Sequence, residues 1–177
     1  MNNYLRLIDT NTTGPRYDVT PLFGNYEAFT ALVEDLAHPF ADAACDYVAG
    51  IDALGFILGT AVALRLQKGF VPIRKGGKLP VAVQRVAFVD YSGETKSLEM
   101  RHDALPPGQK VLLVDEWVET GAQMQAAVRL IEGLGCVVIG LAAINIDDNA
   151  VTGGLRQTYH CHTVTSGVTC GRTGYVE

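Results

Sequence analysis

Apolar runs of strand length alternate along the chain with stretches whose apolar residues recur at helical spacing. Segments of the first kind are residues 47–51, 70–73, 110–114 and 137–146, and segments of the second kind are residues 27–40, 55–67 and 123–134. Such an alternation is typical of α/β folds, because each helix returns the chain to the start of the next parallel strand. The sequence therefore predicts an α/β fold: a parallel sheet flanked by helices.

Three segments depart from this alternation. Residues 74–80 (RKGGKLP) hold three cations and two glycines and are too polar for a core. The strand-like runs at residues 83–91 and 96–101 follow, joined by a short polar turn, and predict a β-hairpin excursion. The tail from Gly153 onward combines Thr, Tyr and Val with several glycines, and we expect edge strands there.

Length and charge narrow the class of protein. The 177 residues suit one domain, 1–177, and the net charge is −5 with a pI of about 5.3. This balance argues against a general nucleic-acid binder, which normally presents a basic face. No apolar run reaches the roughly 18 residues needed to span a bilayer, and the first residues (MNNYLRLIDT) lack the apolar core of a secretion signal. We expect a cytoplasmic protein with no nucleic-acid or membrane partner.

The cysteines and histidines raise the question of a metal. The four cysteines are scattered without a CxxC pair and are expected to be free thiols: Cys45, Cys136, Cys161 and Cys170. The segment His160–Cys161–His162, with Cys170 downstream, is the candidate metal cluster. Its spacing matches no zinc pattern, and alternate strand residues point to opposite faces, so a metal is the weaker of two interpretations.

Residues 111–123 (VLLVDEWVETGAQ) carry the clearest chemical pattern. Asp115 and Glu116 follow an apolar strand and face the crevice where α/β sheets bind ligands, and carboxylates there suit vicinal hydroxyls or a Mg²⁺ shell. A helix start after the loop offers unpaired N–H groups and a partial positive charge to an anion. The donors are those of Thr120, Gly121, Ala122 and Gln123. The alternative is a solvated turn followed by a plain helix start.

Four stretches, in order, resemble the type I phosphoribosyltransferase family and its adenine members most closely. GFVPIRKGGKLP (69–80) resembles the segment before their mobile catalytic loop, and residues 111–123 resemble the ribose-phosphate loop, usually VDDLLATGGT. DVTPLFGNYEAF (18–29) and GIDALGFILG (50–59) resemble DITPLL…AF and GIEARGFLFG. The resemblance covers about residues 17–145. The first stretch is specific to the adenine group and the loop only to the family.

The resemblance implies a fold and a reaction. It implies a small hood at about residues 1–25 and a mobile β-hairpin loop at about residues 75–100. It also implies transfer of ribose 5-phosphate from phosphoribosyl pyrophosphate to a purine base, adenine being the best match, with Mg²⁺ and in a homodimer. The transition state resembles an oxocarbenium ion, so catalysis is mostly positioning, charge stabilisation and exclusion of water.

The sugar and phosphate residues follow by position. Asp115 and Glu116 match the acid pair that holds the ribose hydroxyls, and they are catalytic candidates. Residues 119–123 match the 5′-phosphate loop, but ATGGT is here ETGAQ. A unit charge about 4 Å from another costs on the order of 4 kcal/mol at an effective dielectric near 20. Glu119 therefore predicts weak binding of phosphoribosyl pyrophosphate if it points at the phosphate, and little change if it points outward.

The pyrophosphate residues match the cationic segment and include one departure. Arg74, Lys75 and Lys78 match the cations near the pyrophosphate, and an ordinary solvated turn is the alternative. The Arg that usually stands beside the pyrophosphate is Leu54 here. Its loss removes a charge-assisted contact of roughly 1.5–3 kcal/mol.

The base and loop residues complete the set. Tyr17 falls in the hood over the purine, where Arg is usual, and Trp117 matches an aliphatic residue that packs on the base. A core or dimer contact is the alternative for Trp117. Asp90 and Tyr91 match the Glu-Tyr pair of the mobile loop and are catalytic candidates, with plain hairpin residues as the alternative.

Three functions stay open. The first is a purine phosphoribosyltransferase. The second is a non-transferring purine or nucleotide binder, with a regulatory role. The third is an enzyme for a differently charged sugar, in which Glu119 accepts a hydrogen bond from a free 5′-hydroxyl. The departures cluster at the site while the strands and glycines of the scaffold remain, which favours altered ligand use over decay.

Overall fold

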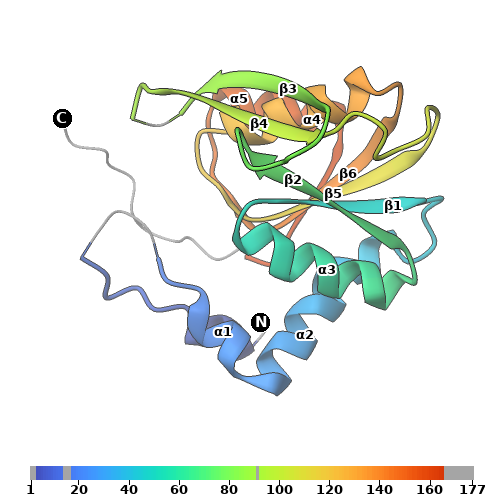
Figure 1. Cartoon of the computed structure of the whole chain (residues 1–177). Helices are drawn as coiled ribbons and strands as arrows, with labels where there is room; N and C mark the ends of the chain where they lie inside the picture. Colours follow the sequence, from blue (N-terminus) through green and yellow to red (C-terminus); the bar gives the residue numbers. More distant parts are fainter. Residues whose placement is uncertain (1–2, 14–16, 91, 166–177) are drawn as a thin grey trace.

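The computed structural model describes residues 3–13, 17–90 and 92–165 and contains the expected alternation of strands and helices (Figure 1). In chain order the elements are η1 (Asn3–Leu7), α1 (Thr20–Gly24), α2 (Tyr26–Ala37), η2 (His38–Phe40), β1 (Tyr47–Ile51), α3 (Leu54–Leu66), β2 (Gly69–Lys75), β3 (Val83–Val89), β4 (Thr95–Arg101), β5 (Lys110–Val118), α4 (Ala122–Gly133), β6 (Val137–Ile146), α5 (Ala150–Thr158) and β7 (His160–Thr163).

The strands form one seven-stranded sheet in the order β3-β4-β2-β1-β5-β6-β7. Strands β2, β1, β5, β6 and β7 pair parallel, whereas β4 pairs antiparallel with both β2 and β3. The predicted fold class, a mainly parallel sheet flanked by helices, is confirmed.

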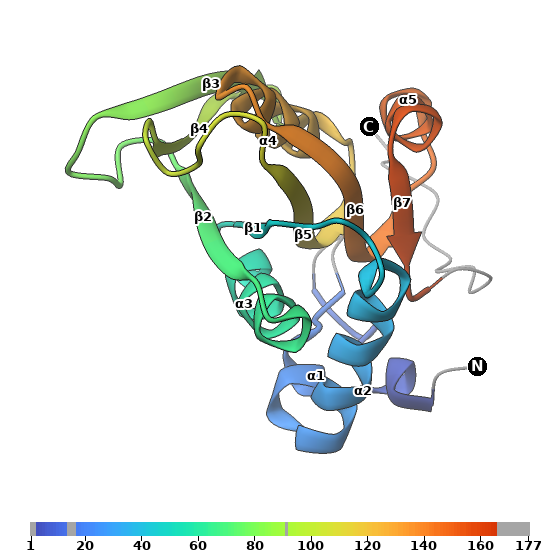
Figure 2. The same cartoon turned by 90° about the vertical axis from the view of Figure 1, so that its right-hand side faces the viewer.

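Helices cover both faces of the sheet, with α1–α3 on one side and α4 and α5 on the other (Figure 2). Strand β5 contributes to both cores. Val111 and Leu113 belong to the core under α4, and Leu112 and Val114 to the core under α3. Alternate strand residues point to opposite faces, so a strand buried on both faces is a continuous apolar run.

The predicted hairpin is the β3–β4 pair, and residues along its length belong to the core. Leu98 and Met100 are fully buried, and Phe88 is 9% exposed. The hairpin forms one edge of the sheet, with β3 as the outermost strand. It is therefore anchored to the core, and its mobility stays a prediction.

Two boundaries differ from the sequence-based expectation. Strand β5 runs on to Val118, through both acids and Trp117, because β6 pairs with it as far as Ile146. The tail from Gly153 was expected to form edge strands, yet residues 153–158 belong to helix α5 and the edge strand is β7. Asn149 caps α5, accepting from the N–H groups of Val151 and Thr152, which offsets the low helix propensity of its two glycines.

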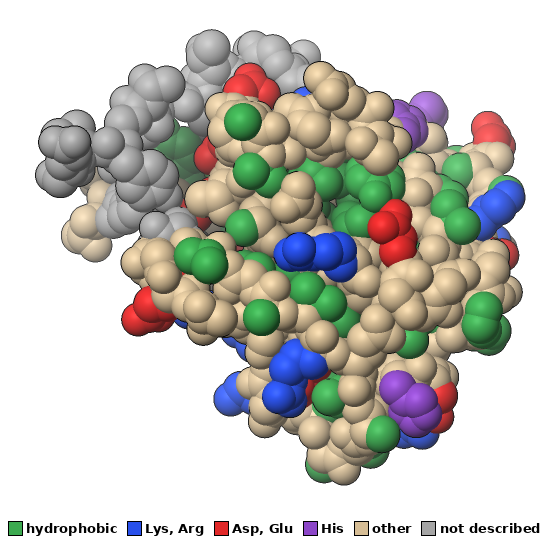
Figure 3. All heavy atoms as spheres, turned by 90° about the horizontal axis from the view of Figure 1, so that it is seen from above, with side chains coloured by type: hydrophobic (Ala, Val, Ile, Leu, Met, Phe, Trp, Pro, Cys, Tyr) green, Lys and Arg blue, Asp and Glu red, His purple; other side chains and the backbone are tan. Residues whose placement is uncertain are grey.

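The N-terminal segment packs beside α2, where the Tyr4 hydroxyl donates to Asp35 Oδ2 at 2.5 Å. Cys45, Cys136 and Cys161 are free thiols as expected, and Cys170 lies outside the described residues. Within the described ranges, none of the helices has the length and apolar character needed to cross a membrane. The face in Figure 3 carries acidic and basic side chains interspersed with apolar ones.

Candidate functional site

The connections of the sheet locate a ligand crevice beside its central strand. Strand β1 lies between β2 and β5. Helix α3 follows β1 and packs on one face, whereas α4 follows β5 and packs on the other. The strand order therefore reverses between β1 and β5, and ligands of open α/β sheets bind outside the carboxyl ends of the strands at such a point.

The acid pair lies at the end of β5, and its first member is deeply buried. Asp115 is 3% exposed, whereas Glu116 is half-buried. Asp115 Oδ1 accepts from the Glu116 N–H at 3.0 Å, and Oδ2 from Gln123 Nε2 at 3.4 Å. Burial, and then the charge of Glu116, raises the pKa of Asp115 well above its usual value. Burial therefore disfavours the charged form of Asp115, and a ligand that donates hydrogen bonds or brings a cation would favour that form.

Glycines let the chain approach Asp115 and the loop closely. A Cβ on Gly55, in the first turn of α3, would lie 2.9 Å from Asp115 Oδ1. Gly121 has a φ of +82°, which strongly favours glycine, and a Cβ there would lie 2.8 Å from Val151 Cγ1. The loop between β5 and α4 is thus pressed against the start of α5.

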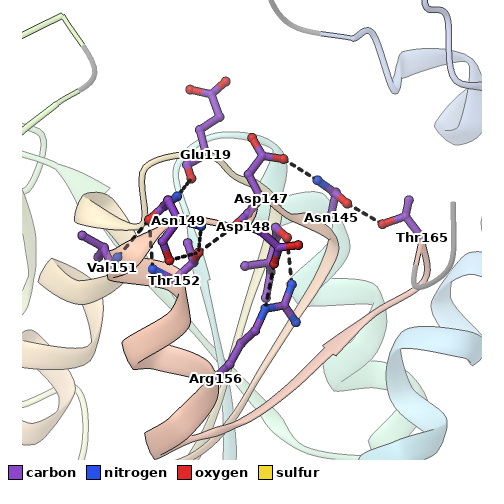
Figure 4. A network of polar contacts seen from close by, with 10 residues as sticks. Glu119, Asn145, Asp147, Asp148, Asn149, Val151, Thr152, Arg156 and Thr165 are labelled. Carbon is purple, nitrogen blue, oxygen red and sulfur yellow. Dashed lines mark hydrogen bonds and ion pairs between the residues drawn. The ribbon is translucent and has the colours of Figure 1, made fainter. Parts of the chain in front are cut away.

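The loop between β5 and α4 is tied to the loop after β6. Asn149 Nδ2 donates to the Glu119 carbonyl oxygen at 2.8 Å. Figure 4 shows the Glu119 side chain directed away from Asn149, on the same side of the loop as the Asp147 carboxylate. The Glu119 charge, after burial, helps to raise the pKa of Asp147. Glu119 and Asp147 therefore direct two carboxylates to the same side of the loop after β5.

Trp117 and Tyr17 lie together beside this loop. Their ring centroids are 5.7 Å apart and the ring planes are 85° to one another, an edge-to-face contact. The indole Nε1–H donates to Asp147 Oδ1 at 3.2 Å. A base stacked on both rings needs them parallel and further apart, so the two residues must separate before a base can lie between them.

A buried carboxylate of β4 fixes the backbone of the cationic segment, residues 74–80. Glu99 of β4 is fully buried and accepts from the backbone N–H groups of Lys78 at 2.7 Å and Leu79 at 2.9 Å. Backbone hydrogen bonds, that of Gly77 first, lower the pKa of Glu99 to about 2. Arg85 completes the set, with Nη2 at 2.6 Å from Oε2. This clamp leaves the Lys78 side chain exposed.

The other two cations of the segment differ in their surroundings. Arg74 Nε lies 3.4 Å from Asp52 Oδ2, at the carboxyl end of β1, which places it at the crevice edge. Lys75 is the last residue of β2 and is exposed.

Comparison with known proteins identifies the family. Residues 26–165 match the phosphoribosyl transferase domain. The chain is 47% identical to an adenine phosphoribosyltransferase of Chelativorans sp. over 123 residues, covering 69% of this chain and 67% of that one. It is 42% identical to that of Rhodopirellula baltica over 149 residues, covering 83% and 71%. The crystal structure of adenine phosphoribosyltransferase from Rhodothermus marinus matches with a TM-score of 0.82 and 35% identity, over 91% of this chain and 94% of that one.

The chain belongs to the phosphoribosyltransferase family. The predicted family, its adenine branch and the predicted class of enzyme are confirmed. A phosphoribosyltransferase from Saccharomyces cerevisiae, complexed with an imino-altritol bisphosphate and adenine, also matches, with a TM-score of 0.77 and 27% identity over 90% of this chain and 97% of that one.

The phosphoribosyltransferase resemblance assigned Asp90 and Tyr91 to the mobile catalytic loop. Asp90 Oδ1 accepts from Ser92 Oγ at 2.6 Å and from the N–H groups of Ser92 and Glu94, and Lys96 Nζ pairs with Oδ2. Lys96 and then Ser92 lower the pKa of Asp90. In this state Asp90 closes the hairpin turn, which favours the plain hairpin alternative for it. Tyr91 lies outside the described residues.

Leu54 replaces the Arg that the family usually has beside the pyrophosphate, and its surroundings in the structure are apolar. Leu54 is the first residue of α3 and packs against the apolar core on that face. This phosphoribosyltransferase therefore presents an apolar side chain where the family usually presents an Arg.

The candidate metal cluster does not assemble among the described residues. No group of three or more His, Cys, Asp or Glu side chains is close enough there to hold a metal ion. His160 instead packs against Phe40 with centroids 5.0 Å apart. The His160–His162 segment is an edge strand of this phosphoribosyltransferase.

Four residues of the site were not singled out from the sequence. Asp147 and Asn149 come after the apolar strand β6, and an acid such as Asp147 directly after an apolar run was a readable signal, as it was for Asp115. Asp52 and Glu99 carried no such signal, because their roles depend on neighbouring strands that are distant in the sequence.

Proposed function

We propose that the chain transfers ribose 5-phosphate from phosphoribosyl pyrophosphate to adenine, forming AMP and pyrophosphate in purine salvage. The observation that carries this proposal is the family match over residues 26–165, which includes the acid pair, the loop after β5 and the cationic segment. Relatives named adenine phosphoribosyltransferase, 42% and 47% identical, support adenine as the base. The sheet brings the acid pair and the loop after β5 to its crevice edge.

In the proposed reaction, N9 of adenine forms a bond to C1 of the ribose as the bond from C1 to the pyrophosphate oxygen breaks. The N9 proton is released, and pyrophosphate leaves with the electron pair. Asp115 and Glu116 hold the ribose hydroxyls, and their negative charge favours the positive charge that develops on the ribose. The N–H groups of residues 120–123 hold the 5′-phosphate.

The leaving pyrophosphate is proposed to meet the cations of residues 74–78. Arg74 lies at the crevice edge beside Asp52, and the Glu99 clamp fixes the backbone from which Lys78 projects. Asp90 and Tyr91 keep a proposed role in closing the loop over the reactants. That role requires Asp90 to leave the turn contacts with Ser92 and Lys96.

Mg²⁺ is proposed as the cofactor, arriving with the pyrophosphate. Mg²⁺ is usually held by one or two carboxylates together with substrate phosphates and water. Asp115 and Glu116 are adjacent carboxylates near the carboxyl end of β5, and carboxylate oxygens are the ligands that Mg²⁺ takes, so this donor set fits. The ion supplies charge neutralisation to the leaving group when bound.

The test is formation of AMP from adenine, phosphoribosyl pyrophosphate and Mg²⁺, followed by chromatography, with hypoxanthine and guanine in parallel. AMP formation in proportion to enzyme supports the proposal. Adenine binding by calorimetry without any AMP would contradict it.

One observation favours a second function. Glu119 and Asp147 direct carboxylates to the same side of the loop after β5, where the phosphate is expected (Figure 4). A ligand without a phosphate tolerates these two carboxylates better than a phosphorylated ligand does. The arrangement therefore favours a non-transferring purine or nucleoside binder, or an enzyme for a sugar with a free 5′-hydroxyl. Calorimetry with adenosine and with AMP separates these two alternatives from phosphoribosyl transfer, because both alternatives predict tighter binding of adenosine than of AMP.

Replacing Trp117 by Ala is expected to weaken adenine binding about ten- to a hundredfold, because base–aromatic stacking is worth roughly 1–3 kcal/mol. Trp117 is the chain's single Trp, so its emission should also change when adenine binds. Calorimetry and fluorescence measure the two effects.

The matched control is Trp117→Leu, which restores the aliphatic type usual in the family and should keep part of the affinity. Adenine binding with unmoved emission and an unaffected Ala variant would show that Trp117 lies outside the base site.

A homodimer is proposed through the outer face of α3. Ile57 and Leu64 lie two helical turns apart and are 43% and 74% exposed. Exposed apolar side chains on one helix face suit a protein interface. Light scattering should give a mass near twice 19.0 kDa, and Leu64→Glu should give monomers. The control is Val137→Glu, at a 52% exposed position on β6. A mass near 19.0 kDa for the unchanged protein rejects the dimer.

The cytoplasm is the proposed compartment. The thiols of Cys45, Cys136 and Cys161 support it, because cysteines stay reduced there.

A further inference from the structure

The indole of Trp117 is hydrogen-bonded to the side chain of Asp147, which follows the neighbouring strand β6. Its Nε1–H donates to Asp147 Oδ1 at 3.2 Å, and Asn145 Nδ2 donates to the same oxygen at 2.6 Å. Trp117 and Asn145 are register partners in the β5–β6 pair. The strand pairing therefore brings the ring and its acceptor together across a separation of 30 residues.

Asn145 is itself fixed from the other side. Thr165 Oγ1 lies 2.5 Å from Asn145 Oδ1, and the Thr165 N–H donates to the Ile144 carbonyl oxygen at 3.2 Å. Figure 4 shows Asn145 between Asp147 and Thr165. Thr165 is 4% exposed, so this anchor is shielded from water. The indole is thus connected through Asp147 and Asn145 to a buried point beyond β7.

The backbone of Asp147 is held independently of its carboxylate. Its N–H donates to the Val118 carbonyl oxygen at 2.9 Å, and its carbonyl oxygen accepts from Thr152 Oγ1 at 2.5 Å. Removing the carboxylate therefore leaves the loop closed, and what changes is the partner of the indole and of Asn145.

We propose that Asp147 is a positioning residue that fixes the indole of Trp117 as the platform for the base. This inference rests on the proposed function, in which the base packs on Trp117. Asp147 acts through the indole and does not touch the base. An indole with its N–H bonded has lost rotamer freedom before the ligand arrives, and such preorganisation lowers the cost of binding. The acceptor oxygen, rather than the charge, is what the indole requires.

The experiment compares Asp147→Ala, Asp147→Asn and Asp148→Ala. The Ala variant removes the acceptor, whereas Asn keeps an oxygen that accepts from both Trp117 and Asn145. Asp148 is the matched control, because its side chain is 96% exposed and pairs with Arg156 at 3.7 Å instead. The measurements are emission anisotropy of Trp117 without ligand, adenine affinity by calorimetry, and separate KM values for adenine and phosphoribosyl pyrophosphate.

The Ala variant should lose anisotropy and bind adenine about tenfold more weakly, the scale of one net hydrogen bond. Its KM for adenine should rise. The Asn variant, which keeps the acceptor oxygen, and the Asp148→Ala control should match the unchanged protein in anisotropy and adenine affinity. Because Ala and Asn both remove the Asp147 charge, any change in KM for phosphoribosyl pyrophosphate should be equal in these two variants.

Three results overturn the inference. They are equal adenine affinity and anisotropy in the Ala variant, an equal loss in all three variants, and no purine binding by the unchanged protein. A protein that shows the expected variant pattern but forms no AMP would instead refute the proposed transfer reaction and leave the inference standing.

Discussion

Asp115→Asn is expected to make the ligand-free protein more stable at neutral pH while lowering kcat/KM for phosphoribosyl pyrophosphate. Burial, and then the charge of Glu116, raises the pKa of Asp115, so holding this carboxylate ionised costs free energy. The amide keeps an acceptor for the Glu116 N–H without the charge. Charged hydrogen bonds are worth about 1.5–3 kcal/mol, so the loss of the carboxylate should lower kcat/KM roughly ten- to a hundredfold.

The stability difference should depend on pH in one direction. The folded protein holds the Asp115 proton over a range in which the unfolded chain has released it. Within that range the free energy of unfolding falls by about 1.36 kcal/mol for each unit of rising pH. The range begins near the unfolded pKa of about 3.9 and ends at the raised folded pKa. Asn at this position does not titrate and escapes the loss.

Urea unfolding at pH 4 and pH 8 measures the effect. Asp115→Asn should be more stable than the unchanged protein at pH 8, and the difference should shrink at pH 4. Asp103→Asn is the control, because Asp103 is exposed and pairs with Arg101 on the surface. Lower stability of the Asp115 variant at pH 8, or full activity, would contradict the burial argument.

The strands were predictable because their burial is visible in the sequence. Strands β1 and β6 match their predicted bounds, since strands covered on both faces are continuous apolar runs. Helix α5 was missed because Gly153 and Gly154 obscure its period and only Thr152 and Leu155 are buried. The sequence signal for this helix was its cap residue Asn149, which is polar and therefore does not contribute to the apolar spacing.

The residues of the site also divide into those that the sequence predicts and those that it does not. The acid pair and the loop after β5 were identified because they are contiguous and come directly after an apolar run in the sequence. The Trp117–Asp147 bond and the Glu99 clamp join segments that meet only through strand pairing, and a single sequence does not encode register openly. Asp90 shows a further limit, because the same carboxylate suits a hairpin turn and a catalytic loop, and only its contacts separate the two.

Glu119→Ala is expected to tighten binding of phosphoribosyl pyrophosphate and AMP. The Glu119 side chain is half-buried, and it lies on the same side of the loop as Asp147, whose pKa it helps to raise. At an effective dielectric near 20, a unit charge costs on the order of 4 kcal/mol at about 4 Å from a phosphate charge and on the order of 2 kcal/mol at about 8 Å. Removing it should therefore tighten binding of phosphorylated ligands by about thirtyfold or more over this range of distances.

Glu119→Gln separates charge from space, because it keeps the shape of the side chain and removes its charge. If charge is the cause, Gln and Ala give similar gains for AMP, and neither changes the affinity for adenine. Glu27→Ala is the matched control, an exposed acid in the first turn of α2 on the other face of the sheet.

Salt provides the decisive check on Glu119. Added salt screens charges in water, so the gain in AMP affinity should shrink as ionic strength rises. A gain that is independent of salt and confined to the Ala variant would mean that Glu119 obstructs the phosphate by its size. Unchanged or weaker AMP affinity in both variants would show that the loop accepts phosphate despite Glu119. In that case the departure from the family loop at this position does not alter which sugar the enzyme uses.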